Sequence, residues 1–469
     1  MVFSSLYFLY LFLPLTVLLY FVTPKKFRCF TLLLCSLVFF AWGELKYLLL
    51  MLFTVTVDYL AGLLLGLLRK KGCGKKREKP VLIAAVIVNL GLLGLFKYAD
   101  FFLGTVNGIF KTDVPLLELA LPLGISFYTF QALSYVIDVY KEQCSVQKSF
   151  VKFAMYITMF PQLIAGPIVR YTDVEAQMDD RSVTPEQVAR GIRRFLVGLG
   201  KKVLFANTAG ALFDSLHAYG DSLSSLGAVL MALCYTFQIY FDFSGYSDMA
   251  IGLGRIFGFD FPENFRYPYE ADSITDFWRR WHITLSTFFR EYVYIPLGGN
   301  RCGKARQIFN LFVVWLLTGF WHGAGWTFLL WGLYFFVLLM LEKTFLLRLL
   351  QKAPKFVGHL YALVFIVFGW VIFSAESVGD VGGFLVCLFG KNGFCDDVSL
   401  YYLVHNVLPL LLFAVGSTRL PLFLAEKANA KLGEKAAFPL RTVGCACLLL
   451  LCTAFLAGDG YNPFLYFRF

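Results

Sequence analysis

The stretch Asp276–Arg301, DFWRRWHITLSTFFREYVYIPLGGNR, gathers charged residues, aromatic residues and a histidine in a chain that is otherwise strongly apolar. Its first half predicts a helix from Asp276 to Phe289, in which Asp276 and Arg280 have the i,i+4 spacing of an ion pair. Such a helix would carry His282 on one face together with apolar side chains. Because it is too polar to cross lipid, we expect it to lie at the membrane interface or to enter the membrane part of the way.

The rest of the chain has the composition of a membrane protein. Of its 469 residues, 58% are hydrophobic and only 16% are charged, whereas soluble proteins contain about 25% charged residues. Apolar stretches that approach the roughly 20 residues needed for a helical crossing recur from one end to the other. These features predict an all-α polytopic membrane protein with about 11–12 transmembrane helices, and re-entrant or interfacial helices around a central polar funnel.

The distribution of apolar and polar residues divides this single membrane domain, 1–469, into three regions. Residues 1–115 are apolar helices joined by short basic loops, and 346–469 return to plain apolar spans. Between them, in 116–345, the apolar runs are interrupted by glycine, proline, asparagine and charged residues. We expect this middle region to be the functional core.

Two segments of the core carry polar side chains in apolar surroundings. YFDFSGYSDMAIG (Tyr240–Gly252) includes Asp242, and FPENFRYPY (Phe261–Tyr269) includes Asn264 and two prolines that exclude a regular helix. Irregular backbone at membrane depth survives only where it is buried in protein or lines a wet cavity. The sequence therefore predicts a polar interior path supported by Asp242 and Asn264.

The basic residues are concentrated in short loops. Arg69–Lys79, RKKGCGKKREK, holds seven of them, and Thr23–Arg28 holds three more. Short basic loops mark the cytoplasmic side of a membrane protein, so we expect the N-terminus to lie outside. The net charge of +11 is explained in this way, or by contact with lipid headgroups or an acidic partner, and nucleic acid is not indicated.

One of the five histidines lies between two strongly apolar runs. LLTGFWHGAGWTFLLWG (Leu316–Gly332) contains His322, with Trp321 beside it. On a continuous helix, Gly319 and Gly325 would share its face and leave space around the ring. An ionisable group at membrane depth indicates a functional site, and burial favours the neutral imidazole that can act as a general base. The alternative is a structural histidine bonded across a glycine-lined helix contact.

Other kinds of site lack their motifs. There is no G-x-S-x-G, no H-E-x-x-H, no Walker loop and, among eleven cysteines, no C-x-x-C pair. His282 and His322 have no evident third ligand. We therefore predict neither a metal site nor a bound cofactor.

Several stretches, taken together and in order, resemble the membrane-bound O-acyltransferase superfamily and in particular its bacterial alginate O-acetyltransferase-like branch. The resemblance covers nearly the whole chain, and the stretch at Asp276 and the one around His322 are its strongest parts. The others are MVFSSLYFLYLFLPL at the N-terminus, LPLGISFYTFQALSYVIDVY (Leu121–Tyr140), FPQLIAGPIVRY (Phe160–Tyr171), the segments that contain Asp242 and Asn264, and NPFLYFRF (Asn462–Phe469).

The resemblance implies roles for individual residues. His322 corresponds to the catalytic histidine of the superfamily, and His282 to a second polar position that would assist it. His282 or a nearby arginine would stabilise the oxyanion that develops during the reaction. The residues expected to line or support the substrate channel are Asp276, Trp278, Arg279, Arg280, Trp281, Trp321, Asn264 and Asp242.

The resemblance also implies a function. The protein would be an O-acyltransferase of a bacterial cytoplasmic membrane that moves an acyl group, most simply acetyl, from a cytosolic thioester to a hydroxyl group of an extracytoplasmic polysaccharide. Acetyl-CoA or an acyl carrier protein would be the donor, and transfer would be direct or through a secreted or membrane-tethered partner protein. Two alternatives remain: D-alanyl transfer to teichoic acid from a carrier protein, and, in another class, a transporter or flippase with broken helices.

Overall fold

The computed structural model describes residues 2–181, 183–458 and 460–465, and all regular secondary structure in these residues is helical. In the same residues five helices are long and apolar enough to cross a membrane, or six if the bent pair Asp397–His405 and Val407–Gly416 forms one span. The prediction of an all-α multi-pass membrane protein is confirmed. Other apolar stretches form shorter or broken helices, so the number of crossings and the central funnel stay predictions.

The contacts between residues divide the chain into two compact units. One contains Met1–Phe195 and Met249–Glu263, and the other contains Leu196–Asp248 and Asn264–Phe469. The division into three regions along the sequence also stays a prediction, since the unit boundaries fall elsewhere.

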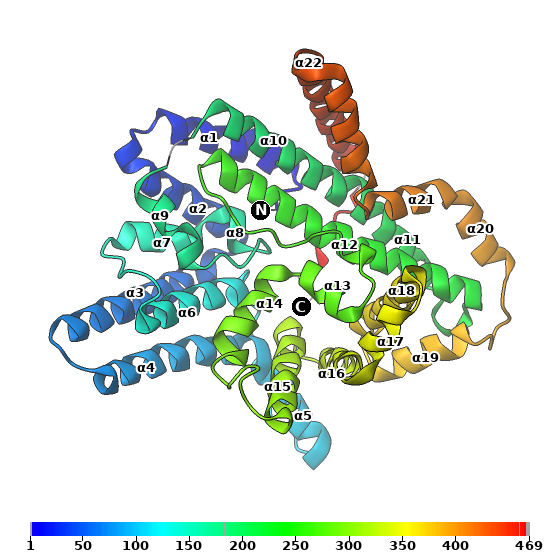
Figure 1. The fold of residues 1–469 in the computed structure, drawn as a ribbon, viewed down its shortest axis with the longest axis horizontal. Coiled ribbons are helices and arrows are strands. Elements are labelled where there is room, and N and C mark those ends of the chain that lie inside the picture. Colours follow the sequence, from blue (N-terminus) through cyan, green and yellow to red (C-terminus); the bar gives the residue numbers. More distant parts are fainter. Residues whose placement is uncertain (1, 182, 459, 466–469) are drawn as a thin grey trace. The chain divides into compact units, whose positions relative to one another are not determined.

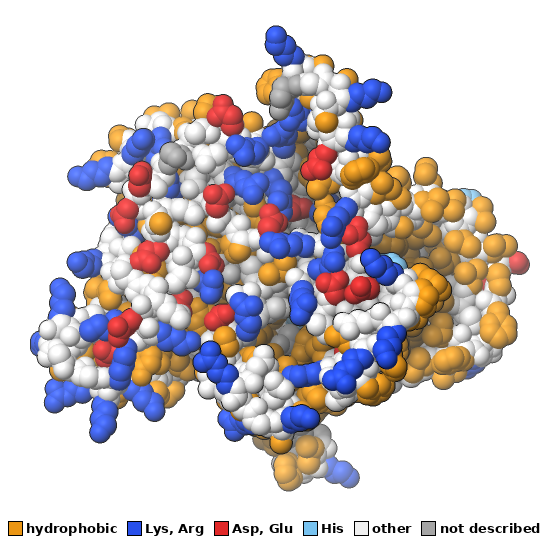
Figure 2. Space-filling model, viewed as in Figure 1, with side chains coloured by type: hydrophobic (Ala, Val, Ile, Leu, Met, Phe, Trp, Pro, Cys, Tyr) orange, Lys and Arg blue, Asp and Glu red, His pale blue; other side chains and the backbone are white. Residues whose placement is uncertain are grey.

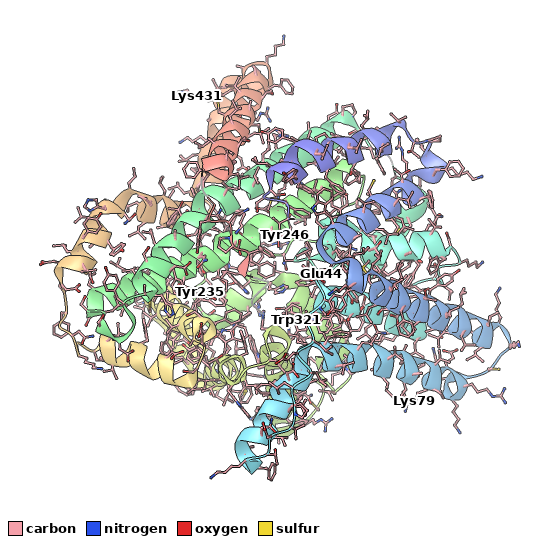
Figure 3. All side chains as sticks on the ribbon, turned by 180° about the vertical axis from the view of Figure 1, so that it is seen from behind. Glu44, Lys79, Tyr235, Tyr246, Trp321 and Lys431 are labelled. Carbon is pink, nitrogen blue, oxygen red and sulfur yellow. The ribbon has the colours of Figure 1, made fainter. Side chains whose placement is uncertain are left out.

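The first unit is built around an antiparallel pair of helices, α3 and α4, against which α6 packs (Figure 1). Its helices are α1 (Leu13–Val22), α2 (Arg28–Glu44), α3 (Leu48–Lys70), α4 (Lys75–Leu93), α5 (Ala99–Phe110), α6 (Ile125–Lys141), α7 (Phe150–Thr158), α8 (Phe160–Leu163), α9 (Tyr171–Asp179) and most of α10 (Pro185–Gly200). Gly62 on α3 allows a close approach, because a Cβ atom there would overlap the hydroxyl group of Tyr135 on α6. Lys79 lies near the outer end of α4 (Figure 3).

The second unit contains both candidate histidines. Its helices are α11 (Asn207–His217), most of α12 (Ser225–Ile256), α13 (Ile274–Arg280), α14 (Ile283–Phe289), α15 (Lys304–His322), α16 (Trp326–Leu341), α17 (Leu347–Lys352), α18 (Lys355–Ser374), α19 (Val378–Leu388), α20 (Asp397–His405), α21 (Val407–Gly416) and α22 (Leu420–Gly458), which is kinked at Gly433. α15 and α16 form a helical hairpin, and α16 also packs against α18.

The hairpin of α15 and α16 depends on two glycines. A Cβ atom at Gly319 would overlap the carbonyl oxygen of Phe328, and one at Gly332 would overlap the carbonyl oxygen of Trp315. The two backbones therefore approach more closely than larger residues permit. This packing fixes the end of α15, where His322 is the last helical residue.

Candidate active site

The predicted continuous helix from Asp276 to Phe289 is wrong, because the backbone breaks at His282. α13 ends at Arg280 and α14 begins at Ile283, and His282 between them has φ 43° and ψ 53°. This left-handed conformation costs a residue with a Cβ atom about 1–2 kcal/mol. A backbone hydrogen bond of 3.0 Å from Ile283 N–H to the carbonyl oxygen of Asn264 supports the break.

The break places the imidazole of His282 in the interior, where only 1% of the residue is exposed. Its ring stands at right angles to that of Phe243, with 4.7 Å between ring centres. The ring centre lies 5.8 Å from that of Trp321 and 6.4 Å from that of His322. The two candidate histidines, forty residues apart in the sequence, are therefore neighbours.

Asn264 forms hydrogen bonds both to the imidazole of His282 and to the backbone beside the helix break. It is fully buried, and its Oδ1 lies 3.1 Å from Nδ1 of His282. The same oxygen accepts hydrogen bonds from the backbone N–H and the hydroxyl group of Thr284, and Nδ2 donates to Ser247 on α12. Asn264 thus holds His282 by its ring and by the backbone beside it.

His322 is buried at the C-terminal end of α15, with 7% of the residue exposed. Gly323 leaves the helix in an extended conformation, so Gly325 does not share the helical face of His322 as the sequence suggested. The imidazole lies among aromatic rings, with centres 5.1 Å from Trp331, 5.2 Å from Phe373 and 5.1 Å from Trp321.

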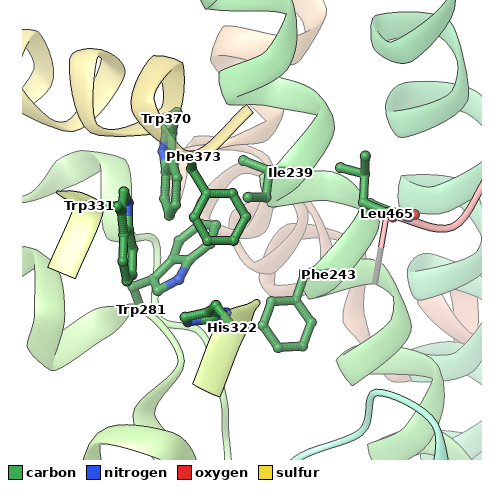
Figure 4. Close-up of a pocket in the computed structure, with 9 residues that line it drawn as sticks. Ile239, Phe243, Trp281, His322, Trp331, Trp370, Phe373 and Leu465 are labelled. Carbon is green, nitrogen blue, oxygen red and sulfur yellow. The ribbon is translucent and has the colours of Figure 1, made fainter. Parts of the chain in front are cut away.

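A small cavity adjoins His322 (Figure 4). Its volume is about 20 Å³, little more than the space of one water molecule. Its walls are mostly aromatic and aliphatic, and its lining residues are Ile239, Asp242, Phe243, Trp281, His322, Trp331, Trp370, Phe373 and Leu465. They come from α12, α16 and α18, from the end of α15, from the residue after α13, and from the segment after α22.

Asp242 joins the cavity to the last described segment of the chain. Its carboxylate forms a 2.7 Å ion pair with Lys202, and both side chains are 4% exposed. The second carboxylate oxygen accepts a hydrogen bond of 2.9 Å from the backbone N–H of Leu465, while Lys202 also donates to the carbonyl oxygen of Pro463. A buried charge needs such partners, and here they fix one wall of the cavity.

The predicted site residues fall into two groups. The structure brings together His322, His282, Trp281, Trp321, Asn264 and Asp242. Asp276 and Arg280 form the expected ion pair, at 2.9 Å, but both are partly exposed, and Arg279 is exposed, so none of the three lines the cavity. Trp278 packs behind the cavity wall, against Trp331. Roles for Asp276, Arg279 and Arg280 beside the substrate stay predictions.

Sequence reasoning missed several residues that build the site. Three of them, Lys202, Trp370 and Phe373, lie in stretches that read as ordinary apolar helix or loop. Trp331 and Leu465 lie in stretches that carry the family resemblance, but nothing in the sequence singles them out. Glu342 was also missed, although a carboxylate inside an apolar run is a signal that could have revealed it.

Glu342 anchors the start of α13. It is buried, and its carboxylate accepts hydrogen bonds from the backbone N–H groups of Ile274 and Thr275, at 2.6 and 2.8 Å. A negative charge at this position also interacts favourably with the helix dipole. The anchor therefore holds the helix that leads into His282.

No metal centre was found in the part of the chain that the structure describes. Among these residues no three His, Cys, Asp or Glu side chains are grouped so that they could hold an ion. The chemistry available at the cavity is that of the His322 imidazole, one buried ion pair and apolar walls, with the imidazole of His282 as a neighbour of His322.

Comparisons with known proteins show the family of the chain. A sequence model of the membrane-bound O-acyltransferase family matches residues 144–379, which include His282 and His322. The chain is 37% identical to the probable alginate O-acetylase AlgI of Azotobacter vinelandii, over 100% of both chains. It is 34% identical to the peptidoglycan O-acetyltransferase of Helicobacter pylori, over 100% of this chain and 98% of the relative. The similarity to the teichoic acid D-alanyltransferase of Bacillus subtilis is 29% identity over 54% of this chain and 69% of the relative.

Proposed function

The chain belongs to the membrane-bound O-acyltransferase family and is an O-acyltransferase, and we propose that it acetylates hydroxyl groups of an extracytoplasmic polysaccharide. Relatives matched over essentially the whole chain are an alginate O-acetylase and a peptidoglycan O-acetyltransferase. The D-alanyltransferase relative matches only about half of this chain, so acetyl transfer is favoured over D-alanyl transfer.

The observation that carries the proposal is the place of His322 at the cavity. The imidazole lines a space of about 20 Å³ whose other walls are apolar or aromatic, apart from the Lys202-paired Asp242. An acetyl group has three heavy atoms and is larger than this space, so the walls have to move for any acyl group to enter, and they move least for the smallest one. We propose that the acetyl carbonyl group is held here, beside His322.

In the proposed reaction His322 acts as the general base. As the acceptor hydroxyl oxygen attacks the thioester carbonyl carbon, the hydroxyl proton passes to the imidazole and a C–O bond forms. The C–S bond then breaks, and the imidazolium returns the proton to the departing thiolate. General-base catalysis contributes roughly 10²–10⁴-fold, and alignment of the two reactants in a water-poor site supplies much of the remaining acceleration.

The donor is an acyl thioester, acetyl-CoA or an acetylated carrier protein, made in the cytosol. The acceptor lies on the other side of the membrane, so the two reactants have to meet inside the protein. We propose that it works in the cytoplasmic membrane of a bacterium, and that transfer to the polymer is direct or is completed by a secreted or membrane-tethered partner, in which case the assay requires that partner as well.

The test is acetyl transfer by the purified protein in lipid nanodiscs. Acetyl-CoA or an acetylated carrier protein, labelled in the acetyl group, is supplied with oligomers of alginate or fragments of peptidoglycan, and ester formation is measured by mass spectrometry. We expect ester formation with the wild-type protein and a loss of at least 10²-fold in His322→Ala.

His405→Ala is the matched control, because His405 is exposed on α20 in the same unit. Its activity should equal that of the wild type. Full activity in a folded His322→Ala variant would refute the base assignment. A D-alanyl carrier protein accepted in preference to both acetyl donors would replace acetyl transfer by D-alanyl transfer.

A further inference from the structure

The hydrogen bonds of Asn264 determine which nitrogen of His282 carries the proton. The backbone N–H of Thr284 can only donate, and it points to Oδ1 of Asn264 at 3.3 Å. The atom at that position is therefore the amide oxygen, and Nδ2, on the other side, donates to Ser247. The orientation of the amide group follows from a donor that cannot change its role.

An amide oxygen accepts hydrogen bonds and cannot donate one. Nδ1 of His282 lies 3.1 Å from this oxygen, so Nδ1 carries the hydrogen. In a neutral imidazole one nitrogen is the donor and the other has the lone pair. Nε2 of His282 is then an acceptor, and it is buried without a hydrogen-bond partner among the described residues.

We infer that Asn264 is a positioning residue that fixes the Nδ1–H tautomer of His282, so that His282 works beside His322 as a hydrogen-bond acceptor and not as a donor to the oxyanion. The inference deepens the proposed function, on which its catalytic meaning rests. It also replaces the expectation that His282 stabilises the oxyanion, because that role requires a hydrogen on Nε2.

The spacing of the two imidazoles indicates what Nε2 accepts from. A direct bond between two nitrogens needs about 3 Å, and ring centres 6.4 Å apart leave the nitrogens too far from each other for one. Nε2 of His282 therefore does not accept from His322. We assign the donor to an O–H group that enters the site, either a hydroxyl group of the acceptor saccharide or a water molecule.

The strained backbone of His282 fits a positioning role for Asn264. His282 keeps a left-handed conformation that is unfavourable for a residue with a side chain. Asn264 stabilises it through Ile283, Thr284 and the ring itself. These three contacts of Asn264 fix both the direction of the His282 ring and its tautomer. In other proteins too, the hydrogen bond of one ring nitrogen determines the state of the other.

Two substitutions of Asn264 separate the tautomer from mere packing. In Asn264→Asp the carboxylate can only accept, and every neighbour can donate to it: His282 Nδ1–H, the N–H and hydroxyl group of Thr284, and the hydroxyl group of Ser247. Asn264→Leu keeps the approximate size and offers no acceptor. We expect Asn264→Asp to keep activity within about 10-fold of wild type, and Asn264→Leu to lose roughly 10²-fold in kcat with a smaller change in KM.

The tautomer itself is read from the ¹⁵N spectrum of histidine-labelled protein in nanodiscs. The chain has only five histidines, and the His282 signals are those that vanish in His282→Gln. We expect a protonated Nδ1 and an unprotonated Nε2 in the wild type. An Nε2 signal that moves when oligosaccharide is added identifies a sugar hydroxyl as its donor, and an unmoved signal identifies water.

Asn310 provides the control, because it is a second fully buried asparagine in the same unit, away from the cavity. Asn310→Leu should leave the His282 spectrum unchanged. A protonated Nε2 in the wild-type spectrum would overturn the inference, even if Asn264→Asp does not fold. So would a folded Asn264→Leu with full activity. If the wild-type protein acetylates no polymer, the proposed function fails while the spectrum still decides the tautomer.

Discussion

At the scale of single residues, His282 is a neutral base at every pH at which the protein would work. It lies between two seven-residue helices, outside the long apolar helices, and burial lowers its pKa from the ordinary 6.5 to about 3. In the unfolded chain its pKa returns to about 6.5. Below pH 6.5 the unfolded chain binds a proton at His282 and the folded protein does not. The free energy of unfolding therefore falls by about 1 kcal/mol for each unit by which the pH is lowered.

This linkage predicts a difference between the wild type and His282→Gln. The stability that the depressed pKa contributes is present above pH 6.5 and is lost as the pH falls from 6.5 towards 3. Between pH 7.5 and 5.5 the apparent melting temperature in detergent should therefore drop more for the wild type than for His282→Gln. Equal drops in the two proteins would mean that His282 is already protonated in the folded state or never titrates in the unfolded one.

Phe373 is expected to limit the size of the acyl group. It lines the cavity, and its ring centre lies 5.2 Å from that of His322. In Phe373→Leu the cavity gains volume beside the imidazole, so a propionyl donor should be accepted more readily. One methylene group in an apolar pocket is worth about 10–200-fold in kcat/KM, and we expect the ratio of propionyl to acetyl transfer to rise by about 10-fold.

The matched control for Phe373 is Phe335→Leu. Phe335 is fully buried and packs against Trp331, but it does not line the cavity. Its substitution should lower stability without changing the ratio of the two donors. An unchanged ratio in Phe373→Leu would show that the acyl group binds elsewhere.

At the scale of helices, the sequence predicted what depends on near neighbours and failed where distant contacts decide. The ion pair between Asp276 and Arg280 follows from their spacing on one turn, and it is present. The break two residues later does not follow, because the left-handed conformation of His282 is held by Asn264, eighteen residues earlier. The ion-pair spacing and the apolar face around His282 favour a continuous helix.

The same limit applies to the cavity. His322 was found from its isolation in an apolar run, a property of the local sequence. Its aromatic surroundings come from Trp331 and Phe373, on two other helices, and no local pattern separates these side chains from ordinary core residues. Lys202, the ionic partner of Asp242, lies forty residues before it and was missed for the same reason.

The hairpin of α15 and α16 provides a prediction at this scale. In Gly319→Ala the new methyl group would overlap the carbonyl oxygen of Phe328, an atom of the backbone that cannot move aside. We expect the helices to separate, with a loss of stability of about 1–3 kcal/mol. His322, three residues further along α15, would move with the helix, and activity should fall by roughly 10²-fold. Melting temperature and acetyl transfer are the measurements.

Gly444→Ala is the control for this substitution. Gly444 also lies within a helix, α22, and a Cβ atom there meets no other atom within 4 Å. Activity and melting temperature should stay at the wild-type level. A Gly319→Ala protein that matched the wild type in both would show that the hairpin does not position His322.

At the scale of the whole chain, the outer surface fits lipid. Large apolar side chains are exposed along α20 and α21, and Figure 2 shows orange side chains covering this surface. They include Leu400, Tyr401, Val404, Val407, Leu408, Leu411, Leu412 and Val415. Soluble proteins rarely expose apolar patches of this extent. In a bilayer the lipid tails contact such side chains, so no partner protein is needed to bury them.

The basic residues predict how the chain is oriented in that bilayer. Lys75, Lys76, Arg77 and Lys79 at the start of α4 are exposed, as is Lys431 on α22 (Figure 3). Because short loops rich in lysine and arginine stay in the cytoplasm, we expect the loop between α3 and α4 to be cytoplasmic and the N-terminus to lie outside. Cys73, partly exposed in this loop, is a natural reporter.

The measurement uses a protein in which Cys73 is the only cysteine and a maleimide that cannot cross membranes. In intact cells Cys73 should not react, and it should react once the membrane is permeabilised. A second protein with Ser5→Cys as its only cysteine should react in intact cells, because Ser5 precedes the first helix. Labelling of Cys73 from outside would reverse the orientation. The donor would then have to reach His322 from the opposite side, so the proposed direction of acetyl transfer would be reversed as well.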